Sequence, residues 1–139
     1  MSSGERRVLH VEDDELNRIL MDHVVALVDG WSVVAASTLA EARAIIDAEQ
    51  VAGHGATSEA AADGTSRLSL VLVDLDLPDG NGDELIVDLR RRGSNVPVWV
   101  VTGDASSATA ERLRSSGIDR VLVKPFDVTA LIADLRGLD

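Results

Sequence analysis

The chain has 139 residues, 45% of them hydrophobic, which suits one compact domain with a buried core. It contains no cysteine, which excludes disulfides and thiolate metal sites, and no apolar run near the ~20 residues of a membrane span. Its formal net charge of -11 argues against binding to nucleic acid and favours an acidic pocket for a cation. The first residues lack the apolar stretch of a signal peptide, and we expect a cytoplasmic protein that binds no membrane.

Short apolar runs alternate with segments of helical periodicity along the chain. The first two strands are predicted over 7–11 and 31–37, each followed by apolar residues at helical spacing. Thr38 and Glu41 form a capping-box pattern at the start of the second helix. Three further strands are expected, each again followed by a helix, over 68–74, 96–102 and 120–124.

This alternation predicts an α/β fold, a doubly wound parallel sheet of five strands with five helices on its two faces. In such sheets, ligands bind at the carboxyl ends of the strands. The segment Gln50 to Ser66, rich in Gly, Ala, Ser and Thr, has no periodicity. We interpret it as a flexible surface insertion in a single domain that spans 1–139.

Polar residues follow four of the predicted strands at their carboxyl ends. They are Glu12, Asp13 and Asp14, then Asp74, Thr102 and Lys124. Carboxylates so close together repel one another, and a hard divalent cation such as Mg²⁺ relieves that repulsion. A lysine and a hydroxyl beside an aspartate at a cation site are suited to phosphoryl transfer, with the aspartate as nucleophile and the other two on phosphoryl oxygens.

Four motifs stand in this strand context: "VEDD", "DLDLPDGNG", "VTG" and "VKPF". In this order they resemble the receiver domain of two-component response regulators, the family of the chemotaxis regulators, over nearly the whole chain. The resemblance implies a flavodoxin-like fold with strand order 2-1-3-4-5, in agreement with the reading from periodicity.

The resemblance also implies a role for each site residue. Asp74 matches the phosphoacceptor, and Asp76, two residues on, matches the residue whose backbone carbonyl binds Mg²⁺. Glu12 and Asp13 match the acidic pair of metal ligands, because the family carries a recurrent arginine five residues after the second acid and Arg18 stands there.

A receiver of this family takes a phosphoryl group from a phosphohistidine of a histidine kinase or a phosphotransfer domain. It catalyses its own phosphorylation and dephosphorylation, is not a turnover enzyme, and signals to a downstream effector that the sequence does not identify. Family analogy places the partner on Leu16, Asn17, Leu20, Pro125 and Phe126. It also implies a cis bond between Lys124 and Pro125.

Some residues depart from the family pattern or keep an ordinary role. Val121 stands where the family carries the aromatic residue that couples to the threonine. Acids at Asp76 and Asp104 occupy positions that tune phosphoryl lifetime, where they hinder anionic donors or orient a water. His10 is interpreted as a packed core histidine, and Asp79 as a solvated turn residue.

Two alternatives come from other functional classes. A phosphatase of the haloacid dehalogenase type also uses an Asp-x-Asp, here Asp74 and Asp76, but in that family this motif follows the first strand. A phosphorylation-independent interaction module is the other alternative. Such modules usually lack a residue of the site, and here the set is complete.

Overall fold

The computed structural model describes residues 6–55, 68–103, 106–115, 117–124 and 127–137. Five parallel strands form the main sheet, in the order β2-β1-β3-β6-β7. Their bounds are β1 Arg6–Val11, β2 Trp31–Ala36, β3 Leu70–Asp74, β6 Val98–Thr102 and β7 Arg120–Val123. With these five strands counted along the chain, the order is the predicted 2-1-3-4-5.

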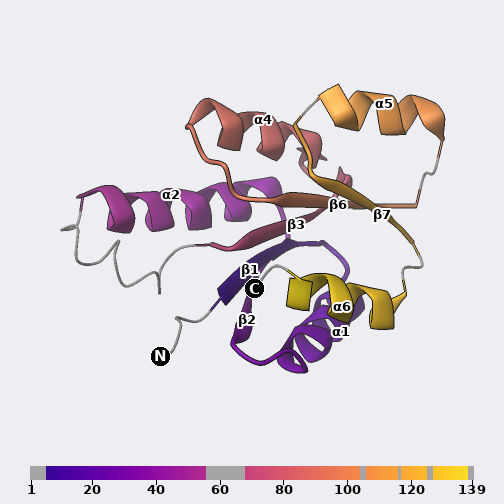
Figure 1. The fold of residues 1–139 in the computed structure, drawn as a ribbon. Helices are drawn as coiled ribbons and strands as arrows, with labels where there is room; N and C mark the ends of the chain where they lie inside the picture. The colour runs from indigo at the N-terminus through magenta and orange to yellow at the C-terminus, as the bar shows by residue number, and fades with distance from the viewer. Residues whose placement is uncertain (1–5, 56–67, 104–105, 116, 125–126, 138–139) are drawn as a thin grey trace.

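Helices cover both faces of this sheet, which gives three layers (Figure 1). On one face lie α2 (Leu39–Gly55), α4 (Asp83–Arg91) and α5 (Ser107–Ser115), and on the other α1 (Glu15–Ala26) and α6 (Val128–Gly137). The predicted alternation of strands and helices is confirmed. No helix in the described part of the chain is long and apolar enough to cross a membrane.

The core divides along the sheet because successive side chains of a strand point to opposite faces. On β3, Val71 and Val73 pack with the residues from α2 and α4, whereas Leu70 and Leu72 pack with those from α1 and α6. By the same alternation, Val8 and His10 face α1 and α6, and Glu12, directly after β1, lines a cavity with residues of these two helices. This alternation therefore sets the side of the sheet on which the site lies.

Two local features differ from the sequence prediction. Residues 50–55 belong to α2, so the prediction that the insertion begins at Gln50 is wrong for them, and residues 56–67 lie outside the described part. After β3 the chain also forms a short antiparallel hairpin, β4 (Asp76–Leu77) with β5 (Gly80–Asn81), which periodicity missed. Strands of two residues are too short for a periodic pattern to show them.

The predicted cap of α2 forms in a variant geometry. Thr38 Oγ1 accepts a hydrogen bond from the backbone N–H of Glu41 at 3.0 Å, as in a capping box. The Glu41 carboxylate, however, accepts from the backbone N–H of Ser37 at 2.7 Å and from the Ser37 hydroxyl. These bonds lower the pKa of Glu41.

Candidate acidic site at the carboxyl ends of the strands

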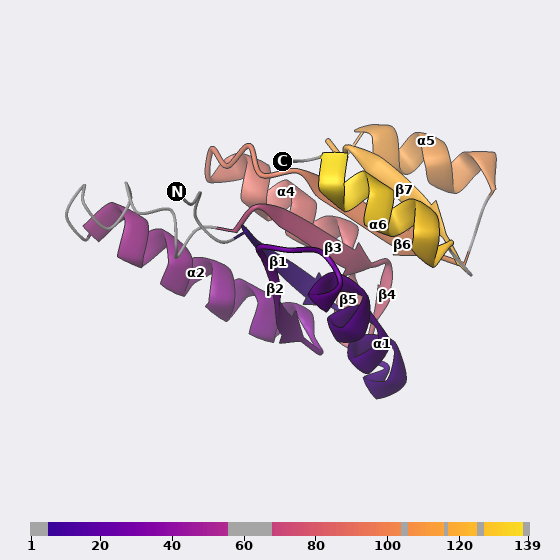
Figure 2. The same ribbon diagram turned by 60° about the horizontal axis from the view of Figure 1, so that its bottom comes forward.

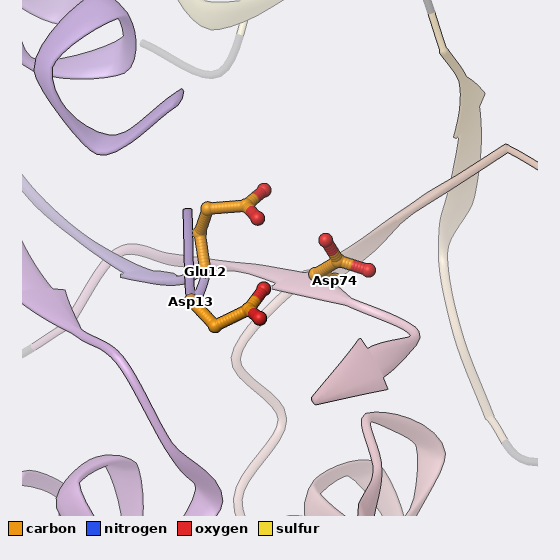
Figure 3. A group of neighbouring side chains, drawn as sticks. All are labelled: Glu12, Asp13 and Asp74. Atoms are coloured by element: carbon orange, nitrogen blue, oxygen red, sulfur yellow. The ribbon is translucent and has the colours of Figure 1, made fainter. Parts of the chain in front are cut away.

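Three carboxylates converge where β1 and β3 end. One oxygen from each of Glu12, Asp13 and Asp74 lies within 4.8 Å of the other two. Figure 3 shows the side chains of Glu12 and Asp13 extending from the end of β1 into the space beside Asp74. Carboxylate oxygens at this spacing fit a hard cation such as Mg²⁺.

The backbone around Glu12 is held from both sides. Its N–H donates to the Ala36 carbonyl at 2.9 Å, and its carbonyl accepts from Arg18 Nη1 at 2.8 Å. Arg18, which served to assign the acidic pair, thus fastens α1 to the end of β1. This contact holds the segment that carries Glu12 and Asp13 against the first helix.

Asp14 caps the first helix. Its side chain accepts a hydrogen bond from the Leu16 N–H at 2.9 Å and a longer one from the Asn17 amide at 3.4 Å, while its own N–H donates to Glu12 Oε2 at 3.3 Å. A side-chain oxygen at this position satisfies an N–H that has no partner inside the helix. The third acid of the run therefore has a local structural role.

Lys124, directly after β7, reaches across the sheet end to two of the acids. Its Nζ lies 2.9 Å from Asp74 Oδ2 and 3.5 Å from Glu12 Oε1. Partial burial acts to lower the pKa of Lys124, but the hydrogen bond and charge of Asp74, followed by those of Glu12, outweigh it and raise the pKa. The lysine is therefore held as a cation against Asp74.

Glu12 is the most perturbed acid of the site. It is 2% exposed, and its burial, followed by a hydrogen bond to Asp74 and the charge of that carboxylate, raises its pKa to about 7. The Lys124 charge and the Asp14 N–H act in the opposite direction. Because a cation favours the ionised form of a carboxylate, Glu12 is suited to exchange a proton for a metal ion.

Thr102 ends β6 beside these groups and is 2% exposed. Its carbonyl accepts the Lys124 N–H at 2.8 Å, which joins the ends of β6 and β7. The loop after β3 returns close to Asp74. The Gly82 N–H donates to the Leu75 carbonyl at 2.8 Å, and a Cβ at Gly82 would lie 2.3 Å from the Asp74 carbonyl oxygen. Only glycine fits there.

A cavity of about 390 Å³ adjoins the site, lined by residues of α1 and α6 together with Glu12 and Lys124. His10 also lines it, is 3% exposed, and its Nδ1 has no hydrogen-bond partner within the described residues. Burial lowers the pKa of His10 to about 4; the Asp74 charge opposes this shift and the Lys124 charge adds to it. His10 is buried, as its place within a strand predicted.

The structure brings together most of the residues that the sequence singled out. Glu12, Asp13, Asp74 and Lys124 meet at one place. Only the backbone of Asp76 is described, and Asp104, Pro125 and Phe126 lie outside the described residues, so the predicted cis bond does too. Asp79 is an exposed turn residue, as we expected, but sequence reasoning missed the hydrogen bonds that its carboxylate accepts from α2.

The predicted partner residues on α1 form an exposed face beside the cavity. Leu16 is 75% exposed and Leu20 48% exposed, and Leu20 and Asn17 both line the cavity. Exposed apolar side chains of this kind are typical of contact surfaces.

Comparison with known proteins agrees with this geometry. Residues 8–136 match the response regulator receiver domain family. The chain belongs to that family. It is thus a receiver domain of the two-component response regulators, as its motifs indicated.

Among curated relatives, the receiver is 39% identical over 72 residues to the transcriptional regulatory protein TctD of Salmonella typhimurium. It is 40% identical over 72 residues to the KDP operon transcriptional regulatory protein KdpE of Escherichia coli. These matches cover 50% and 52% of this chain, but only 31% and 32% of the two relatives. Both relatives are therefore much longer than the part they share with this receiver.

Solved receiver domains share the fold over almost all of the chain. A Francisella response regulator receiver domain superposes with a TM-score of 0.76 at 22% identity and covers 96% of both chains. The chemotaxis regulator CheY4 of Vibrio cholerae superposes with a TM-score of 0.75 at 21% identity and covers 97% of this chain and 99% of its own. At these identities the likeness establishes the fold.

Proposed function

We propose that this receiver accepts a phosphoryl group on Asp74 from a phosphohistidine of a partner kinase or phosphotransfer domain, in a Mg²⁺-dependent reaction, and signals by a change of conformation. The observation that carries the proposal is the placement of Asp74. Its carboxylate lies 2.9 Å from Lys124 Nζ and shares one small space with Glu12 and Asp13. Phosphoryl transfer depends mainly on such positioning of charge.

In the transfer step, an Asp74 oxygen forms the new bond to phosphorus while the bond from phosphorus to the donor histidine nitrogen breaks. The electron pair of that bond stays on the imidazole. Lys124 Nζ is placed to offset charge on a phosphoryl oxygen, and the Thr102 hydroxyl to donate to another. Each of these groups is at the end of a rigid strand, which holds it in place.

The metal ligands that we propose are the carboxylates of Glu12, Asp13 and Asp74 and the backbone carbonyl of Asp76. When bound, Mg²⁺ would offset the charge of these carboxylates and of the phosphoryl oxygens. Glu12 must lose its proton to act as a ligand, and its pKa of about 7 allows this near neutral pH.

The partner that we propose docks beside the site, on the α1 face formed by Leu16, Asn17 and Leu20, with Pro125 and Phe126. Leu16 and Leu20 offer apolar surface there, and the cavity beside them extends to Glu12 and Lys124. A helix of the partner on this face would bring its phosphohistidine near Asp74. The response regulators to which the chain is similar support a histidine kinase as the donor.

The test is binding of beryllofluoride, a phosphoryl mimic, followed by NMR in the presence of Mg²⁺. We expect the wild type to shift resonances around β3 and its loops, and Asp74→Ala to show no shift. Asp29→Ala, a change of the same chemistry at an exposed turn after α1, serves as the matched control and should behave as the wild type. No Mg²⁺-dependent response in the wild type would contradict the proposal and favour a phosphorylation-independent module.

A further inference from the structure

The hairpin that follows Asp74 is tied to a helix from a distant part of the chain. Asp79, in the turn between β4 and β5, accepts hydrogen bonds from the backbone N–H groups of Leu39 at 2.8 Å and Ala40 at 3.0 Å. These are the first residues of α2, whose N–H groups have no partner inside the helix. One carboxylate thus joins the loop after β3 to the start of α2.

This joint is packed as well as hydrogen-bonded. A Cβ at Gly80 would lie 2.8 Å from Leu39 Cδ1, so the turn approaches the first residue of α2 as closely as a glycine permits. Leu39 is fully buried and Leu77 is 9% exposed, and both belong to the same core cluster. Figure 2 shows the hairpin at the end of the sheet where α2 begins. The hairpin and the first turn of α2 therefore form one unit.

The other end of the hairpin is at the site. In β4 and β5, Asp76 pairs with Asn81 and Leu77 with Gly80, and the Gly82 N–H closes the loop onto the Leu75 carbonyl. Asp76 is the residue whose carbonyl we propose as a metal ligand. A hairpin this short has few internal bonds, so contacts outside it help to set its position, and the bonds from α2 to Asp79 are such contacts at its turn.

We propose that Asp79 is a positioning residue for the cation: it fastens the hairpin to α2 and thereby places the Asp76 carbonyl at the metal site. The inference rests on the proposed function, since it assumes Mg²⁺ among these carboxylates. Coupling of this kind is reciprocal, so filling the site also makes the first turn of α2 more ordered. α2 then becomes a route by which the binding of a cation at the site affects the surface of the domain.

The test compares Mg²⁺ affinities of the full chain, measured by NMR titration with Mg²⁺ alone. We expect Asp79→Ala to weaken Mg²⁺ binding about tenfold, the size of effect that loss of a supporting contact has on a metal site. Thr38→Ala is the matched control because the Thr38 hydroxyl caps the same helix by accepting from the Glu41 N–H. It should leave the affinity within about twofold of the wild type.

Asp79→Asn separates position from charge. It removes the negative charge but keeps an oxygen that accepts an N–H of α2, so its affinity should fall between those of the wild type and Asp79→Ala. Equal losses in the asparagine and alanine variants would overturn the inference in favour of simple electrostatic attraction. Equal losses in Asp79→Ala and Thr38→Ala would assign the effect to the helix alone and also overturn it.

Amide exchange without Mg²⁺ gives a readout that does not depend on the metal. Asp79→Ala should speed exchange in residues 75–82 as well as in 39–41, whereas Thr38→Ala should act only on 39–41. Unchanged exchange in 75–82 overturns the inference. A wild type that does not bind Mg²⁺ contradicts the proposed function itself, whereas a wild type that binds it no more tightly than Asp79→Ala overturns the role of Asp79 alone.

Discussion

At the carboxyl end of the sheet, the side chains of the central strands and those of the edge strand differ in their exposure to solvent. At the ends of the central strands β1 and β3, two acids are buried, with Glu12 2% exposed and Asp74 6% exposed, whereas Asp13 is exposed. On the edge strand β7, Val121 is half-buried and Val123 is 41% exposed. Two of the three carboxylates are thus removed from water in the middle of the sheet, while the edge strand is more exposed.

The difference shows how the two regions depend on each other. Buried carboxylates need a counter-charge, and Lys124, which follows the edge strand, supplies one to Asp74 and Glu12. The residue after the edge strand thus supplies the positive charge that the acids at the ends of the central strands need. Val121, also on the edge strand, has no aromatic ring, unlike the residue that the family resemblance leads us to expect there.

The largest expected effect comes from removing the group that joins the two regions. Lys124→Met should slow phosphorylation by acetyl phosphate about 100-fold or more, because the cation beside Asp74 offsets charge that develops on the phosphoryl oxygens. The measurement is the rate of phosphoprotein formation with Mg²⁺ in excess. Arg114→Met, at an exposed cation of α5, is the control and should keep the wild-type rate. An unchanged rate in Lys124→Met would show that the chemistry at Asp74 does not depend on the lysine that follows the edge strand.

The second effect concerns the burial of polar groups in the centre. The pKa of His10 is about 4 in the fold, below its ordinary 6.5, so the unfolded chain binds more protons between these values and the free energy of unfolding falls as the pH drops. From about pH 7.5 to about pH 5, the wild type should lose about 2 kcal/mol relative to His10→Leu.

Urea unfolding of the Mg²⁺-free protein at both pH values checks this prediction. The difference between the two proteins removes the contribution of Glu12, which both share. Val87→Ala, at an exposed position of α4 that carries no titrating group, should show the same pH dependence as the wild type. Equal pH dependence in the wild type and His10→Leu would show that the central strands bury His10 without a penalty in acid.

The smallest effect is expected at the edge. Val121 packs against the core cluster on the α2 face from a half-buried position, so Val121→Ala should reduce the free energy of unfolding by about 1 kcal/mol. Phosphorylation of Asp74 should stay within about twofold of the wild type. Val123→Ala, at the exposed position, should reduce the stability less. A tenfold slower phosphorylation in Val121→Ala would show that the edge does control the chemistry.

Much of the fold was predictable because its elements leave periodic patterns. The five parallel strands are apolar runs, and the last helix carries a clear apolar stripe over Val128, Leu131, Ile132 and Leu135. The end of α2 was not predictable in this way, because Gln50 to Gly55 shows no helical apolar pattern. The β4–β5 hairpin surrounds Pro78 and Asp79, and such a turn signal does not reveal that two residues on each side pair.

The site was predictable to the extent that it follows from topology. Carboxyl ends of parallel strands meet at one end of a sheet, so Glu12, Asp13, Asp74 and Lys124 had to lie close together. The partners of Asp79 were not predictable, since they are 39 and 40 residues away and are backbone groups that any residue provides. The sequence shows only that Asp79 lies in a turn. That this turn lies beside the start of α2 is known only from the fold.

Gly82 has a backbone conformation, with φ -59° and ψ -27°, that any amino acid can adopt, yet a side chain there would collide with the Asp74 carbonyl oxygen. The position is therefore sensitive for reasons of space alone. In a comprehensive substitution screen, Gly82 should rank with the acids of the site although it contributes no functional group. Screens of this domain would then map how closely the returning loop approaches the reacting residue, as well as which residues react.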